Sequence, residues 1–508
     1  RQDSISFAKK IVSENRPLVK ISEMNDKVEA ARGNENIFKD FRASIARKAR
    51  GFLAPEYNIQ CIEAAVNKSF AEGIKVERKL FMELVTGTQS AAQRYAFFAQ
   101  RQVAKIPDIE PDTEIKPFTS IGVIGAGTMG GGISMNFANV GIPVTIIEQS
   151  QERLDKGLGI IRKNYENTAN KGRITFENVE ERTALINGST DINDLSNCDL
   201  IIEAVFENMD LKKDIFKTLD GIAKKGAILA TNTSALDVNE IAAVTSRPED
   251  VIGLHFFSPA NVMRLLEIVR GEKTSKSVVA TSMKMAKNIG KVAAVVGVCP
   301  GFVGNRILAQ RQREANKLIL EGAMPWEVDD ALFNFGFPMG PFAMSDLAGL
   351  DIGWDEDLST GDTLRDKLCE AGRLGQKTGK GFYIYDENRN KSPDEEVEKL
   401  IIEFSEKHQI KRREISKEEI LERCLYPMIN EGFKILEEGM AIRASDIDIV
   451  WINGYGWPIY EGGPMFYGQL IGYEKILKWH KEMEEKFGPD FTPSPYLEKV
   501  VNEKINLF

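Results

Sequence analysis

The sequence contains little cysteine and histidine, no excess of basic residues and no long hydrophobic run. Of its 508 residues only five are cysteine and three are histidine. The cysteines are scattered without a C-x-x-C pair, which argues against a disulfide framework or a zinc site and favours a reducing compartment. No apolar run reaches the roughly 18 residues that a membrane-spanning helix needs. The net charge of −9, from 66 basic and 75 acidic residues, argues against a nucleic-acid partner.

The length and composition are those of a globular protein with several domains. Hydrophobic residues make up 43% of the chain and charged residues 28%, and at roughly 100–200 residues per domain we expect about three or four domains. Because the chain begins at Arg1 rather than Met, we expect a fragment or a processed form. It ends in Asn506-Leu507-Phe508, which is not a peroxisomal tripeptide.

The first 117 residues divide into a helical segment and a linker. Apolar residues recur at three- and four-residue spacing in 58–71 and 76–86, which predicts helices within residues 1–105. Residues 106–117 hold three prolines and four acids. This composition is typical of a linker rather than a core element.

Residues 118–300 have a different pattern, in which short β-branched runs are mostly separated by helical stretches. This alternation predicts an α/β domain with a parallel sheet and crossover helices. The expected strands are Ile121–Ile124, Val144–Ile147, Leu200–Val205, Ala227–Ala230, Val251–Leu254 and Val292–Val296.

From Gly301 onward the sequence is helical again and repeats itself. Three landmarks occur twice in the same order, at offsets of 117 to 123 residues, and we interpret them as two copies of one helical unit. We therefore expect two tandem all-α domains, at 301–400 and 401–508. The paired landmarks are Glu321-Gly322 with Glu438-Gly439, Gly336-Phe337-Pro338 with Gly456-Trp457-Pro458, and Gly340-Pro341 with Gly463-Pro464.

A glycine-rich loop follows the first expected strand and opens a helix. Its three glycines would allow a tight turn, a close approach of the backbone to a pyrophosphate, and close packing of the helix on the strand. The helix N-terminus would then offer N–H groups to the phosphates. The context of strand, loop and helix predicts a Rossmann-like dinucleotide site. The expected contacts are Gly125, Gly127, Thr128, Met129 and Gly130.

The next expected strand ends at Glu148, 23 residues after Gly125. An acid at about this distance accepts hydrogen bonds from the ribose hydroxyls and repels a 2′-phosphate. Glu148 therefore favours NAD over NADP. Arg153 is the nearest cation, and it keeps NADP open as the alternative cofactor.

One histidine is well placed for chemistry. His255 ends an apolar strand, where ligands of open parallel sheets gather, and histidine suits the task of taking a hydroxyl proton while hydride leaves the carbon. Glu267 lies 12 residues on within an apolar run, so we expect it to be at least partly buried and in need of a partner. A structural histidine and an unrelated edge-strand acid are the alternative. His408 and His480, among charged residues, are expected on the surface.

Four motifs together resemble L-3-hydroxyacyl-CoA dehydrogenase, and the resemblance runs from about Phe118 to the C-terminus. The duplicated helical unit is similar to that of bifunctional or trifunctional β-oxidation enzymes, in which this dehydrogenase is fused to an enoyl-CoA hydratase/isomerase. The motifs are Gly125-Ala-Gly-Thr-Met-Gly130, Asn232-Thr-Ser-Ala-Leu236, His255-Phe-Phe-Ser-Pro259 and Gly301-Phe-Val-Gly-Asn-Arg306.

The resemblance implies roles for particular residues in the NAD-dependent oxidation of an (S)-3-hydroxyacyl-CoA to the 3-ketoacyl-CoA. His255 would be the base and Glu267 its partner, while Ser234 and Asn305 would bind at the substrate's 3-oxygen. The implied cofactor contacts beyond the glycine loop and Glu148 are Glu207, Lys212 and Asn232. Acyl chain length and the cations that contact CoA stay open.

Residues 1–105 resemble the last helices of the hydratase/isomerase domain with its linker helix. The hydratase carboxylates and oxyanion loop would precede Arg1, so we expect no hydratase activity from this chain. Because family enzymes without the duplication pair through the helical domain, we expect a monomer, with thiolase or a hydratase module as candidate associates. The expected compartment is the bacterial cytoplasm, or the peroxisome if a terminal signal has been truncated.

Two other function classes remain open from the sequence. One is a non-catalytic NAD-binding protein, since lens crystallins have been recruited from this family. The other is a different NAD-dependent hydroxy-acid or sugar-nucleotide dehydrogenase on a similar sheet.

Overall fold

The computed structural model describes residues 2–17 and 20–508, so that Arg1, Leu18 and Val19 lie outside the described residues. The chain forms two compact units, one up to Ala91 and the other from Ala92 to Phe508. Within the described residues, no helix combines the length and the apolar character that crossing a membrane requires. The division into five segments at 105, 117, 300 and 400 stays a prediction.

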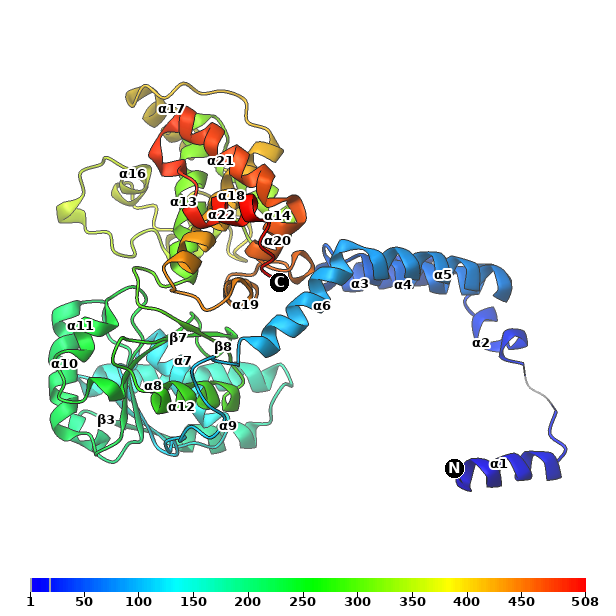
Figure 1. The fold of residues 1–508 in the computed structure, drawn as a ribbon, viewed down its shortest axis with the longest axis horizontal. Coiled ribbons are helices and arrows are strands. Elements are labelled where there is room, and N and C mark those ends of the chain that lie inside the picture. The colour runs from blue at the N-terminus through cyan, green and yellow to red at the C-terminus, as the bar shows by residue number, and fades with distance from the viewer. Residues whose placement is uncertain (1, 18–19) are drawn as a thin grey trace. The chain divides into compact units, whose positions relative to one another are not determined.

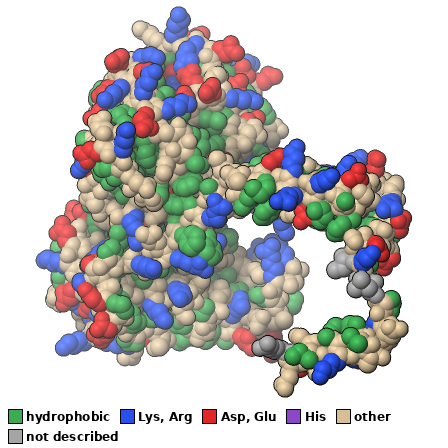
Figure 2. All heavy atoms as spheres, turned by 45° about the vertical axis from the view of Figure 1, so that its right-hand side comes forward, with side chains coloured by type: hydrophobic (Ala, Val, Ile, Leu, Met, Phe, Trp, Pro, Cys, Tyr) green, Lys and Arg blue, Asp and Glu red, His purple; other side chains and the backbone are tan. Residues whose placement is uncertain are grey.

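The N-terminal unit consists of helices, as the periodicity predicts. Arg42 in α3 donates to Glu56 and Glu63 of α4, which ties these two helices together. Several large apolar side chains of the unit are exposed, among them Ile62 and Phe81, and Figure 2 shows such side chains among the charged ones on its surface. The helices of this region are α1 (Gln2–Ser13), α2 (Asp26–Glu29), α3 (Asn36–Ala49), α4 (Leu53–Asn67), α5 (Phe70–Thr86) and α6 (Thr88–Gln102), the last of which continues into the second unit.

The second unit begins with an eight-stranded sheet in the order β3-β2-β1-β4-β5-β6-β7-β8. Strand order reverses between β1 and β4, and such a switch point is where open sheets bind ligands. The strands are β1 (Ile121–Ile124), β2 (Val144–Ile147), β3 (Ile186–Ser189), β4 (Leu200–Glu203), β5 (Ile228–Thr231), β6 (Val251–Phe256), β7 (Leu265–Val269) and β8 (Val292–Val296).

The sheet is parallel, as predicted, apart from one pairing, in which β7 runs antiparallel to β6. A parallel crossover needs roughly a dozen residues or more, and the short connection between Phe256 and Leu265 allows only an antiparallel return. The sequence also gave no indication of the short edge strand β3, two of whose four residues are exposed.

Helices cover both faces of the sheet (Figure 1). One apolar core joins the sheet to α7, α8, α9 and α12, and a second joins it to α10 and α11. These helices are α7 (Thr128–Ala138), α8 (Gln151–Asn170), α9 (Phe176–Ala184), α10 (Met209–Ile222), α11 (Val238–Ala242) and α12 (Lys276–Asn288).

The remainder of the second unit is helical apart from the two-residue strands β9 (Ile384–Tyr385) and β10 (Lys391–Ser392). We call α13, α14 and α15 the first copy and α18, α19 and α20 the second copy of the repeat. The helices are α13 (Gly304–Glu321), α14 (Pro325–Phe335), α15 (Pro341–Ala348), α16 (Leu364–Glu370), α17 (Glu395–Lys407), α18 (Lys417–Glu437), α19 (Ala444–Gly454), α20 (Pro464–Ile471), α21 (Tyr473–Phe487) and α22 (Pro495–Glu503).

The two copies contain the same hydrogen-bonded turn. In the first, Asp329 of α14 accepts from the backbone N–H groups of Phe342 and Ala343 at the start of α15. In the second, Asp448 of α19 accepts in the same way from Met465 and its successor at the start of α20. A buried acid thus satisfies donors at a helix start in both copies.

The first helices of the two copies, α13 and α18, pack against each other through reciprocal ion pairs. Each arginine binds two acids in the other helix or at the residue that ends it, and every residue on one side has its counterpart 117 positions along the chain. The pairs are Arg306 with Glu431 and Glu438, and Arg423 with Glu314 and Glu321. The contact therefore has the form of an isologous interface within one chain.

Candidate active site

The glycine loop has the geometry that its sequence predicts. Gly125 has a positive φ of 101°, and a Cβ there would lie 2.7 Å from the carbonyl oxygen of Ala204. A Cβ on Gly130 would lie 1.8 Å from the carbonyl oxygen of Gly125, so only glycine allows α7 to pack this close to β1. At Gly127, by contrast, a Cβ would meet no atom within 4 Å. That open side faces the space where a pyrophosphate would bind.

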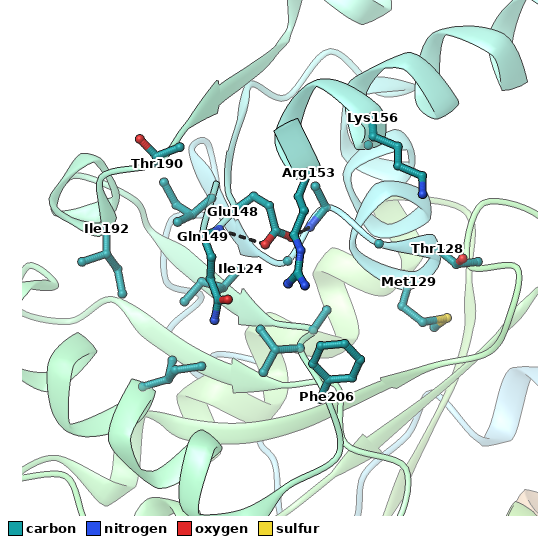
Figure 3. A pocket seen from close by; sticks show the side chains of 18 of the residues that line it. Ile124, Thr128, Met129, Glu148, Gln149, Arg153, Lys156, Thr190, Ile192 and Phe206 are labelled. Atoms are coloured by element: carbon teal, nitrogen blue, oxygen red, sulfur yellow. Dashed lines mark hydrogen bonds between the residues drawn. The ribbon is translucent and has the colours of Figure 1, made fainter. Parts of the chain in front are cut away.

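A cavity of about 700 Å³ lies beside this loop. Gly125, Gly127, Thr128, Met129 and Glu148 all line it, and Figure 3 shows Glu148 pointing toward the loop from the end of β2. The volume lies within the range of about 300–1,000 Å³ usual for ligand sites. The loop, the acid and the space therefore fit a dinucleotide.

Glu148 is held by two backbone donors. Its Oε2 accepts from the N–H of Ala126 at 3.0 Å and its Oε1 accepts from the N–H of Gln149 at 2.8 Å. Each carboxylate oxygen can accept further hydrogen bonds, so the ribose hydroxyls still find acceptors there. Arg153 and Lys156 of α8 line the same cavity, and Figure 3 shows Arg153 close to Glu148.

His255 and Glu267 form a buried pair. They are direct partners in the antiparallel register of β6 and β7, and His255 Nδ1 lies 2.8 Å from Glu267 Oε2. The side chains are 7% and 0% exposed. The expectation that Glu267 is buried with a partner is confirmed, and it lies on an inner strand rather than the edge. Such a pairing fixes the tautomer of the histidine and leaves Nε2 for a substrate proton.

The helix that carries Asn305 is bound to this pair. Glu267 Oε1 accepts from the backbone N–H of Gly304 at 2.9 Å, at the first residue of α13. A negative charge is stabilised at a helix N-terminus, and Asn305 follows directly. Its Oδ1 accepts from the hydroxyl of Tyr455 at 2.7 Å. The structure thus brings His255, Glu267 and Asn305 into one cluster.

Ser234 and the predicted ribose contacts form a second cluster. Glu207 Oε1 accepts from Ser234 Oγ at 3.0 Å and from Thr233 Oγ1 at 2.7 Å. Burial acts to raise the pKa of Glu207, but these hydrogen bonds and the charge of Lys212 outweigh it and lower the pKa. Because Ser234 donates to Glu207 here, donating to a substrate oxygen would require its hydroxyl to turn.

Lys212 is deeply buried under this second cluster. Its Nζ lies 2.7 Å from Oε1 of Glu203 and 3.4 Å from Oε2 of Glu207, and its side chain is only 1% exposed. Sequence reasoning missed Glu203, although it ends an apolar run just as Glu267 interrupts one. Asn232 has a structural contact, since its Oδ1 accepts from the N–H of Phe256 next to His255. The predicted roles of Ser234, Glu207, Lys212 and Asn232 stay predictions.

The other two histidines differ from each other. His408 is exposed, as expected. The expectation for His480 is wrong, because it is 1% exposed and its ring nitrogens lie 2.9 Å from the carbonyl oxygen of Phe491 and 3.3 Å from that of Tyr426. Burial lowers its pKa.

Among the described residues, no group of three or more histidine, cysteine or acidic side chains is arranged to hold a metal ion.

Sequence comparison matches the same parts of the chain to known domains. The 3-hydroxyacyl-CoA dehydrogenase NAD binding domain matches residues 120–299. The C-terminal domain of the same family matches twice, at 301–385 and at 420–506. A peroxisomal bifunctional enzyme of Cavia porcellus is 41% identical over 99% of this chain and 73% of its own length.

Solved structures agree with these matches. A 3-hydroxybutyryl-CoA dehydrogenase from Escherichia coli superposes with a TM-score of 0.65 at 26% identity, over 76% of this chain and 99% of its own. The dehydrogenase part of multifunctional enzyme 1 from C. elegans gives a TM-score of 0.61 at 32% identity, over 82% and 99%.

The comparisons confirm the predicted resemblance, the fold of a sheet domain followed by helical repeats, and NAD as the cofactor. The chain belongs to the 3-hydroxyacyl-CoA dehydrogenase family and is an NAD-dependent dehydrogenase.

Proposed function

We propose that this chain oxidises an (S)-3-hydroxyacyl-CoA to the 3-ketoacyl-CoA in fatty-acid β-oxidation, with His255 as the general base. The observation that carries the proposal is the buried pair of His255 and Glu267 on adjacent strands, 2.8 Å apart. The names of the relatives, among them a peroxisomal fatty acid beta-oxidation multifunctional protein of Arabidopsis thaliana at 32% identity, support the substrate class.

The reaction transfers one proton from the substrate to the protein. His255 Nε2 takes the proton of the 3-hydroxyl group while Nδ1–H donates to Glu267, whose carboxylate stabilises the imidazolium that forms. The N–H of Gly304 keeps Glu267 in place. Asn305 and Ser234 bind the 3-oxygen as it becomes a carbonyl. Bound NAD supplies the acceptor for the hydride that leaves C3.

Turnover in the reductive direction tests the assignment. Purified chain with acetoacetyl-CoA and NADH should consume NADH, and His255→Gln should lower kcat by about 10²–10⁴-fold, the usual contribution of a general base. His408→Gln is the matched control and should leave kcat unchanged. Unchanged turnover in His255→Gln would rule out His255 as the base.

Two further assays define the limits of the activity. Oxidation of the 3-hydroxybutyryl-CoA thioester but not of free 3-hydroxybutyrate would support an acyl-CoA enzyme, and the reverse would point to a hydroxy-acid dehydrogenase. We also expect no hydration of crotonyl-CoA by this chain, and measurable hydration would contradict that expectation.

We also propose that the chain is a monomer in which the second copy takes the place of a partner subunit. The reciprocal ion pairs between α13 and α18 support this, because an isologous contact of this kind is what a symmetric dimer would otherwise use. Light scattering should give a mass near 56.7 kDa. A stable dimer formed through residues 301–508 would refute the proposal.

The relatives also suggest a compartment and associates. Several are named as peroxisomal proteins, and we propose that this protein acts in peroxisomes, where a thiolase or a hydratase module is a candidate associate. Fractionation of the source cells should place the protein with peroxisomal markers, and recovery in the cytosol alone would contradict this.

A further inference from the structure

The side chain that touches Asn305 comes from the second copy of the helical repeat. Tyr455 follows the last residue of α19, and its hydroxyl donates to Asn305 Oδ1 at 2.7 Å. Its ring stacks on Trp451 with centroids 4.5 Å apart and meets Phe257 edge-on at 5.3 Å. Phe257 in turn contacts the ring of His255 at 4.3 Å. Tyr455 therefore contacts both the amide group of Asn305 and Phe257, the aromatic residue that packs against His255.

The backbone around Tyr455 is packed closely against the site. A Cβ on Gly304 would lie 2.4 Å from the tyrosine ring, so Gly304 leaves the room that Tyr455 fills. The second copy is also bound to the sheet beside β7 and β8 (Figure 1), since the N–H of Gly297 donates to the carbonyl oxygen of Met440 and Gly454 allows close contact with Leu265. These contacts restrict the position of the Tyr455 ring.

The hydroxyl of Tyr455 is specific to the second copy. The landmark Gly456-Trp457-Pro458 corresponds to Gly336-Phe337-Pro338, so the residue before it, Tyr455, corresponds to Phe335. Phe335 packs in the aromatic core, with its ring 5.4 Å from that of Trp457. A phenylalanine is thus sufficient for packing at this point of the repeat, and packing alone does not explain the hydroxyl.

The hydrogen bond determines which way the amide of Asn305 points. A tyrosine hydroxyl that donates to Oδ1 uses the acceptor side of the amide, which leaves the Nδ2 hydrogens for the substrate oxygen. Burial and the negative charge of Glu267 raise the pKa of Tyr455 well above its usual range. The hydroxyl therefore keeps its proton and acts as the donor over the working pH range.

We infer that Tyr455 is a positioning residue of the dehydrogenase site, holding the amide of Asn305 so that Nδ2 donates to the substrate's 3-oxygen. The second copy is then part of the active site and not only a packing partner of the first. This inference rests on the proposed role of Asn305.

A double-mutant cycle tests the inference. Tyr455→Phe removes only the hydroxyl, and it should lower kcat with acetoacetyl-CoA about tenfold, as loss of a group that orients a catalytic residue does, with little change in the dissociation constant of NADH. In an Asn305→Ala background the same substitution should change kcat less than twofold, because the amide it orients is gone. Tyr467→Phe, which removes a hydroxyl elsewhere in the second copy, is the matched control and should leave kcat unchanged.

Each other result overturns the inference in a recognisable way. An equal loss of kcat in both backgrounds would show that Tyr455 acts through packing, and no loss in either would show that its hydroxyl has no role. If Asn305→Ala alone left kcat unchanged, that result would refute the role of Asn305 in the proposed function, and with it the inference about Tyr455. A thermal unfolding scan of Tyr455→Phe should match the wild type, and a large drop in its midpoint would overturn the inference by assigning the hydroxyl to stability.

Discussion

The two copies of the helical repeat share the same structural contacts but contribute different side chains to the active site. Both contain the buried acid that holds the following helix start, Asp329 in one and Asp448 in the other. Where they face the sheet domain they differ, because the first copy provides Gly304 and Asn305 while the second provides Tyr455. The contacts that hold the helices together are therefore the same in both copies, whereas the side chains that face the active site differ.

The largest effect is expected at the ion pairs that join the copies. Arg423 is 1% exposed and binds Glu314, which is fully buried, whereas Arg306 is 17% exposed and binds Glu431, which is 9% exposed, and Glu438, which is 47% exposed. Removing one partner of a buried pair leaves an uncompensated charge and costs about 3–5 kcal/mol, while exposed pairs contribute about 0–1 kcal/mol. Arg423→Met should therefore destabilise the helical region more than Arg306→Met, because only one of the two pairs of Arg306 is largely buried.

Tryptophan fluorescence during urea unfolding can measure this difference. All five tryptophans lie between residues 326 and 479, so the signal reports the helical region alone. Similar unfolding midpoints for the two variants would mean that the two halves of the symmetric contact contribute equally.

A second effect, smaller in free energy, separates the copies by function. Glu422 occupies in the second copy the position that Asn305 has in the first, 117 residues earlier, and it contacts Tyr426 and Lys475. Asn305→Ala should lower kcat about 100-fold, or ~2.7 kcal/mol, as loss of a donor to the reacting oxygen does. Glu422→Ala should change kcat less than twofold. Steady-state assays with acetoacetyl-CoA decide this, and comparable losses would deny the functional difference between the copies.

The smallest effect concerns the insertion that only the second copy has. Burial raises the pKa of Glu461 in this insertion to about 7. Because the folded state prefers the protonated acid, its contribution to stability is complete below the unfolded pKa of about 4.3 and is lost as the pH rises to about 7. Glu461→Gln should therefore raise stability by up to about 2 kcal/mol at pH 8, after allowance for partial exposure, and by almost nothing near pH 4.

Thermal unfolding of both proteins across this pH range is the measurement. A gain that is the same at pH 4 and pH 8 would mean that the carboxyl group of Glu461 is not responsible for it.

Local patterns predicted the parts of the site that neighbouring residues determine. The glycine loop and Glu148 follow from spacing within one strand–helix–strand unit, and Glu267 was found because an acid within an apolar run needs a partner. The antiparallel turn between β6 and β7 then places it opposite His255.

Other features depend on contacts between distant parts of the chain, or on the periodicity of a helix rather than on the neighbouring residues in sequence. Tyr455 is 150 positions from Asn305, and no local pattern indicates such a contact. His480, however, shares the helical spacing of the buried residues Ile476, Leu477 and Met483. Its charged neighbours in sequence pointed to the surface, but the 3.6-residue period of the helix places it on the buried face.

The most direct test of the account is a crystal structure with NAD⁺ and acetoacetyl-CoA bound together. We predict that the 3-oxygen of the ligand lies within hydrogen-bond distance of both His255 Nε2 and Asn305 Nδ2, with Tyr455 still donating to Asn305 Oδ1. A 3-oxygen bound away from His255, with the histidine contacting neither the ligand nor a water between them, would contradict the central claim that the His255–Glu267 pair performs the proton transfer.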